Sequence, residues 1–116
     1  MNTINWIESG RVRDAYLAAC ALDVAALKPG NVSAASAGHG MTSDDFHRSA
    51  LASAAAVSDA APGLGKRIRR AVTATQDAVG MNTNLGIVLL CAPLAEAALR
   101  ATTGRPLRSV VREVLR

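Results

Sequence analysis

The chain has 116 residues, half of them hydrophobic, and a formal net charge of +4. This length and composition predict a single domain, residues 1–116, and exclude a disordered chain. The 24 alanines and three aromatic residues favour closely packed helices, because alanine promotes helix and lets backbones approach.

The charge is unevenly spread along the chain. Residues 1–62 contain four basic and six acidic residues, and residues 63–116 contain nine basic and three acidic ones. The basic half is typical of a polyanion-binding surface or of a solvated helix face. The apolar run 85–95 is too short to cross a bilayer, and the first residues lack the pattern of a signal peptide. We therefore expect a cytoplasmic protein with no membrane partner and reduced cysteines.

The first predicted helix covers 11–27, where apolar residues recur at helical spacing before Pro29–Gly30 ends the pattern. Residues 28–41 predict a loop of small residues. Thr42 and Asp45 then resemble a capping box, followed by an apolar helical stripe that consists of Phe46, Ala50, Ala54 and Val57.

A third helix is predicted up to Gly80, with one face that contains Ile68, Val72, Thr75 and Val79. Residues 84–102 are predicted to be helical rather than a strand, since a lone strand would leave its backbone groups unpaired. Pro93 is expected to break or restart this helix. Pro106 opens a last helical segment, and we expect its apolar face to be covered by another chain or disordered: Leu107, Val110, Val111 and Val114.

Asn82, Thr83 and Asn84 directly precede the most apolar run of the chain. Amide side chains are costly to bury without partners. They can cap the helix that follows, or they can line a ligand site, because the start of a helix attracts phosphate. Capping the helix requires only one of these residues, so three polar residues in succession favour a ligand site.

Three stretches together resemble the triphosphoribosyl-dephospho-coenzyme A synthases: LDVAALKPGNVS (22–33), GHGMTSDDFHRSALAS (38–53) and GMNTNLGIVLLCAPLAEAA (80–98). The resemblance implies an all-α fold, here a compact bundle of four to five helices. It also implies that a hydroxyl of dephospho-coenzyme A, or of a related phosphorylated acceptor, displaces adenine from ATP. Mg²⁺ is expected with the ATP.

The resemblance assigns candidate roles to nine residues. Asp23 is the candidate catalytic carboxylate, which would activate the hydroxyl or stabilise an oxocarbenium-like centre; a solvated or ion-paired acid is the alternative. Asp44 and Asp45 are weak candidates for metal ligands, and capping is the stronger alternative for Asp45. The candidate substrate- and nucleotide-binding residues are Lys28, Asn31, His39, Asn82, Thr83 and Asn84. We expect the loop 28–33 and the turn 80–84 to converge on one cleft, with Asp23 at its wall.

Two differences from the family suggest a divergent branch. The family's NTHKG is NTNLG here, so Asn84 and Leu85 replace a histidine and a lysine, and an aspartate near His39 is absent. Family members are also longer, so we expect the N-terminal part of a larger helical domain, completed by a C-terminal half or by a homo-oligomer. As this partial chain, the protein is expected to release little or no adenine by itself, and a non-catalytic nucleotide-binding or interaction module is the alternative. Nucleic acid is not expected as a partner, since the basic half has no aromatic residue for stacking.

Overall fold

The computed structural model describes residues 9–26, 43–81, 83–100 and 105–116. These residues form five helices and no strand: α1 (Ser9–Ala25), α2 (Ser43–Ser58), α3 (Leu64–Val79), α4 (Leu85–Arg100) and α5 (Leu107–Val114). The predicted all-α fold is therefore confirmed, and so is the helical assignment of the apolar run that begins at Leu85.

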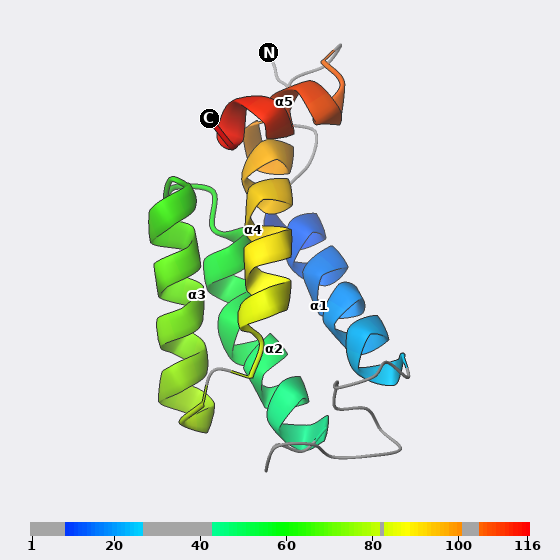
Figure 1. The fold of residues 1–116 in the computed structure, drawn as a ribbon, viewed down its shortest axis with the longest axis vertical. Helices are drawn as coiled ribbons and strands as arrows, with labels where there is room; N and C mark the ends of the chain where they lie inside the picture. The colour runs from blue at the N-terminus through cyan, green and yellow to red at the C-terminus, as the bar shows by residue number, and fades with distance from the viewer. Residues whose placement is uncertain (1–8, 27–42, 82, 101–104) are drawn as a thin grey trace.

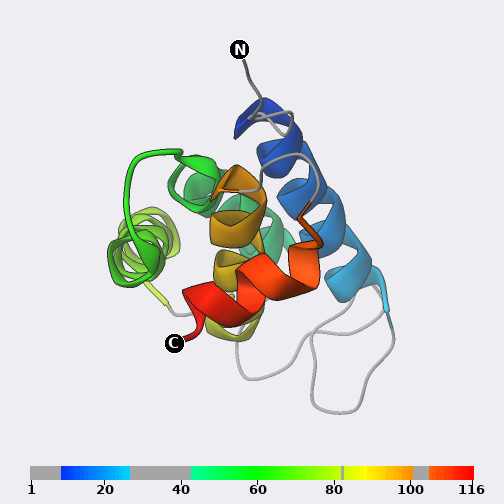
Figure 2. The same cartoon turned by 90° about the horizontal axis from the view of Figure 1, so that it is seen from above.

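The helices form a bundle in which α2 lies between α1 and α3 and packs against both. In Figures 1 and 2, α4 lies on one side of this layer and α5 crosses the C-terminal end of α4. Small side chains let α2 and α4 approach their neighbours closely. The core consists of Val12, Tyr16, Cys20, Ala50, Ala54, Val57, Ala71, Val88 and Ala95.

Gly80 ends α3, as the sequence predicts. Its φ of 79° lies in the left-handed region, and its N–H donates to the carbonyl of Gln76 at 2.8 Å. Glycine adopts this conformation without the steric cost that other residues incur. The turn that leads into α4 therefore starts at a position set by local sequence.

Pro93 does not break α4, which continues through it from Leu85 to Arg100. The predicted break is therefore wrong. Proline removes one backbone hydrogen bond, but Val88, Ala92 and Ala97 on either side of it are fully buried. Packing of both turns holds the helix in one piece.

The apolar face of α5 is partly covered within the chain. Val110 is buried, and α5 packs on α4. The prediction that another chain covers this face is therefore wrong for Val110. Leu107 stays exposed over 45% of its surface.

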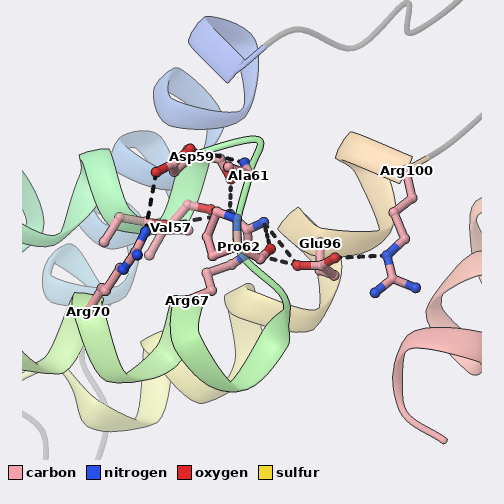
Figure 3. Close-up of polar contacts among 9 residues, drawn as sticks. Val57, Asp59, Ala61, Pro62, Arg67, Arg70, Glu96 and Arg100 are labelled. Atoms are coloured by element: carbon pink, nitrogen blue, oxygen red, sulfur yellow. Dashed lines mark hydrogen bonds and ion pairs between the residues drawn. The ribbon is translucent and has the colours of Figure 1, made fainter.

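A buried arginine on α3 joins three parts of the fold (Figure 3). Only 1% of the Arg67 side chain is exposed, and its Nε and Nη2 atoms donate to the Glu96 carboxylate on α4 at 3.1 and 2.9 Å. The guanidinium also donates to the carbonyls of Val57 at 2.8 Å and Pro62 at 3.1 Å, and to that of Asp59. Arg67 thus ties the α2–α3 connection to α4.

Glu96 is equally well satisfied. Its second carboxylate oxygen accepts a hydrogen bond from the Nε atom of Arg100 at 2.8 Å, one turn along α4. Both oxygens of a buried carboxylate therefore have charged donors. A pair of this kind is strongly destabilised when one partner is removed, because the other charge stays buried.

Burial also changes the acidity of groups in the core. It raises the pKa of the Cys20 thiol to about 11, and it raises the pKa of the Tyr16 hydroxyl well above its usual range. Cys20 and Cys91 are free thiols, as expected, and burial raises the pKa of Cys91 too. The folded chain therefore keeps these groups protonated at pH values where they would ionise in water.

We predict that Glu96→Gln lowers the free energy of unfolding by about 3 kcal/mol, because the Arg67 charge then stays buried without its carboxylate. Chemical denaturation measures the change. The control is Arg70→Gln on α3, the helix of Arg67, which removes an exposed ion pair with Asp59 (3.7 Å) and should cost less than about 1 kcal/mol. Equal effects of the two substitutions would contradict the central role of Arg67.

We also predict that the chain loses stability in alkaline solution. An unfolded thiol ionises near its ordinary pKa of about 8.5, whereas the pKa of Cys20 in the folded chain is about 11. The stabilisation is therefore complete below pH 8.5 or so and decreases as the pH rises towards about 11. Urea denaturation over this range measures it, and Cys20→Ala should give a shallower slope. A pH-independent midpoint would contradict the prediction.

Candidate functional site

Asp23, the predicted catalytic carboxylate, lies in a groove between the end of α1 and the start of α4. The groove has a volume of about 540 Å³ and is lined by Ala19, Leu22 and Asp23 from α1 and by Gly86, Ile87, Leu90 and Cys91 from α4. The Asp23 side chain is half-buried. The structure therefore brings Asp23 and the first turns of α4 to one surface, although more than 60 residues separate them.

Asp23 is the one carboxylate among the residues that line this groove. Cys91 is the other ionisable group there, and burial together with the nearby Asp23 raises the pKa of its thiol. A thiol with a raised pKa is a poor nucleophile. A half-buried carboxylate among apolar side chains is instead suited to accept a proton from a bound hydroxyl group.

Thr83 and Asn84 hold the start of α4 on α2. Both side chains are buried. The Thr83 hydroxyl bonds to the Ser49 hydroxyl, and the Asn84 amide donates to the Ser53 hydroxyl at 3.2 Å and to the Ser49 carbonyl at 3.4 Å. These contacts give the two residues a role in packing, and their role in ligand binding stays a prediction.

Asn84 also stands at the N-cap position of α4, because its carbonyl accepts the first backbone bond of the helix, from Val88 at 3.0 Å. The hydroxyl network extends further into the core, where Tyr16 on α1 bonds to Ser53 at 2.7 Å. Polar side chains of α1 and α2 and of the residues that lead into α4 therefore meet in one network.

Ser49 and Ser53 were not among the residues singled out from the sequence. Their spacing of four places them on one side of α2, next to the apolar stripe. Both also donate back to carbonyls one turn earlier, Asp45 at 2.6 Å and Ser49 at 2.8 Å. Two hydroxyl residues beside an apolar stripe indicate that polar partners are buried against this face of the helix. Here the partners are Thr83 and Asn84.

Asp44 and Asp45 occupy the first turn of α2. Asp44 is exposed, and the Asp45 carboxylate lies 4.0 Å from the Arg48 guanidinium. Adjacent residues on a helix do not face each other, so these two carboxylates are poorly placed to share one ion. The described part of the chain contains no group of three or more His, Cys, Asp or Glu side chains that could hold a metal. The roles of Asp44 and Asp45 as metal ligands stay a prediction.

The remaining predicted binding residues lie outside the described part of the chain: Lys28, Asn31, His39 and Asn82. The expected convergence of the loop 28–33 with the turn 80–84 falls on these segments and stays a prediction. Among the helices that the structure describes, none is long and apolar enough to span a membrane.

One family model matches residues 9–116, a range that contains all five helices, the groove and Asp23. No curated protein and no solved structure matches the chain. The match covers far more than half of the sequence, and it agrees with the helical fold and with the motifs around Asp23 and Asn84. The chain therefore belongs to the CitG family, described as ATP:dephospho-CoA triphosphoribosyl transferase.

Proposed function

We propose that the chain acts in triphosphoribosyl transfer from ATP to dephospho-coenzyme A or a related phosphorylated acceptor, with Asp23 as the catalytic base. Membership of the family supports the reaction class. The observation that carries the assignment of the site is the position of Asp23, a half-buried carboxylate in a groove that is otherwise apolar.

The chemistry needs one proton acceptor at the attacking oxygen. The acceptor hydroxyl forms a bond to the anomeric carbon of ATP, and the bond between that carbon and adenine breaks. The hydroxyl proton passes to Asp23, and adenine leaves with the bonding electron pair and takes up one proton. A base in this position contributes about 10²- to 10⁴-fold to such a reaction.

The triphosphate requires positive charge, and no basic side chain is among the described residues that line the groove. Mg²⁺ that arrives with ATP would neutralise part of that charge. Phosphate also suits the start of a helix, and the first turn of α4 borders the groove through Gly86 and Ile87. We therefore place the ribose end of ATP near Asp23 and the phosphates towards the start of α4.

A second candidate function is nucleotide binding without catalysis. Two features favour it. The side chains of Thr83 and Asn84 bond to serines of α2, and Leu85 stands where the family has a lysine. Each feature leaves fewer polar groups to hold a reacting ligand. The two candidates differ in one product, since only the transferase releases adenine.

We predict that Asp23→Asn slows the release of adenine from ATP, in the presence of Mg²⁺ and dephospho-coenzyme A, at least about 100-fold relative to the unsubstituted chain, whose own release we expect to be small. Chromatography of the reaction mixture measures adenine. ATP with Mg²⁺ should raise the melting temperature of both proteins, because a ligand that binds only the folded state stabilises it.

The matched control is Asp14→Asn, the same change on the same helix at an exposed carboxylate beside Arg13. It should release adenine at the unsubstituted rate. Stabilisation by ATP without adenine release would support the second candidate. No stabilisation by ATP in a folded sample would overturn both assignments of the groove.

A further inference from the structure

A second groove lies between α1 and α4, on the other side of Ala19 from Asp23. It has a volume of about 430 Å³, which is within the range of small-molecule sites. We call it the alanine groove, because four alanines in its lining leave space between the two helices: Ala15, Ala19, Ala95 and Ala98.

The alanine groove continues the groove that contains Asp23. Ala19 and Cys91 line both of them, and α1 and α4 run past each other in opposite directions (Figure 1). Asp23 stands four residues after Ala19, which is about 6 Å along the helix. Arg11 stands eight residues before Ala19, which is about 12 Å. A ligand that reaches Asp23 can therefore extend into the alanine groove.

The lining of the alanine groove is apolar. Its floor consists of core side chains that are at most 8% exposed: Val12, Tyr16, Val57 and Ala95. The Tyr16 hydroxyl is already bonded to Ser53 at 2.7 Å. Arg11 is the one charged side chain among the described residues that line the groove. A triphosphate would lose its hydration here with little compensation, whereas an uncharged segment would bury apolar surface.

Of the two substrates in the proposed reaction, only dephospho-coenzyme A has a long uncharged segment, its pantetheine arm. The arm runs from the diphosphate to a terminal thiol through about 13 chain atoms, as many as in four extended residues, so it spans about 14 Å. This length matches the roughly 12 Å from Ala19 to Arg11 along α1. Ala15 is exposed at one side of the groove, so the two amides of the arm can stay in contact with water.

We propose that the alanine groove binds the pantetheine arm of dephospho-coenzyme A, with the terminal thiol at the end formed by Arg11 and Leu107. This proposal rests on the proposed function, because it takes dephospho-coenzyme A as the acceptor and Asp23 as the site of the reacting hydroxyl. It makes Ala15 a determinant of acceptor specificity, since a larger side chain there fills the space of the arm.

The groove with Asp23 suits the charged part of the same substrate. Leu22 and Leu90 in its lining are exposed, so this groove is open to solvent and the diphosphate keeps part of its hydration there. The ribose hydroxyl then lies at Asp23 and the arm lies beyond Ala19. ATP, with its phosphates towards the start of α4, approaches Asp23 from the opposite side.

The thiol at the end of the arm provides a direct probe. Leu107→Cys introduces a second thiol at the place where the arm ends. Its thiolate attacks one sulfur of the disulfide form of dephospho-coenzyme A, forms a mixed disulfide and releases the other half as a thiol. This reaction should be at least about tenfold faster than that with glutathione disulfide, because a bound reagent acts at an effective concentration of about millimolar. Mass spectrometry measures both rates.

Leu115→Cys is the matched control, an exposed leucine directly after α5 and outside the groove lining. It should react with the two disulfides at similar rates, and the unsubstituted chain is the blank for Cys20 and Cys91. Similar rates at position 107 would overturn the proposal. The same acceleration at both positions would overturn it too, because it indicates binding to the surface at large.

Filling the groove should abolish the effect. Ala15→Phe should remove the acceleration at position 107 and weaken the binding of dephospho-coenzyme A at least about tenfold in calorimetry, because the arm loses its apolar contacts. The control is Ala18→Phe, the same change at an exposed alanine of α1 outside the groove lining, and it should change neither quantity more than about twofold. Circular dichroism checks that both variants stay helical. Equal effects of the two substitutions would contradict the site.

Adenine release separates this proposal from the proposed function. Acceleration at position 107 without adenine release supports the site for the arm and counts against transfer by this chain. Adenine release without acceleration leaves the transfer in place and overturns the site for the arm. Absence of both overturns both.

Discussion

The structure depends most on the buried charge of Arg67. A guanidinium has five N–H donors and cannot lose its proton, so a site that is 99% covered must supply acceptors for it. Those acceptors are the Glu96 carboxylate and the carbonyls of the α2–α3 connection, Val57 and Pro62 among them. An arrangement of α3 and α4 that moved these acceptors away from Arg67 would leave its charge buried among apolar groups without a partner. Arg67 therefore selects one packing of the alanine-rich helices, whose small side chains would by themselves allow several.

The opposite end of α4 is held by a different interaction. Thr83 and Asn84 bond to the two serines of α2, and Tyr16 joins the same network from α1. With its start tied to α2 and its later turns tied to Arg67, α4 has little freedom to move relative to the bundle. The groove with Asp23 lies along this fixed helix, so its shape follows from the packing of α1 and α4 rather than from a flexible side chain. The outer side of α4 keeps exposed leucines, Leu89 and Leu90 among them, while α5 packs on the C-terminal end of the helix (Figure 1).

Leu90 of α4 lines the groove with Asp23 and is exposed over 67% of its surface. Asp23 is half-buried, and among the described residues that line the groove the other ionisable group is the Cys91 thiol, whose pKa is raised by burial and by Asp23. The role of Asp23 as a base stays a proposal.

The sequence by itself determined the helices, because apolar spacing, Gly80 and Pro106 are local signals that act within a few residues. It also determined the motifs that place the chain in its family. It misjudged Pro93, since the packing of Val88 and Ala97 outweighs the loss of one hydrogen bond. Only the tertiary structure showed that Arg67 is buried, because the basic residues near it in sequence, Lys66, Arg69 and Arg70, are exposed and its carboxylate partner lies 29 positions away. The same holds for the partners of Thr83 and Asn84: the sequence left a helix cap or a ligand site open, and the fold joins both residues to Ser49 and Ser53. A polar side chain can be buried only where other helices supply hydrogen-bond partners for it. Long-range packing decides where those partners lie.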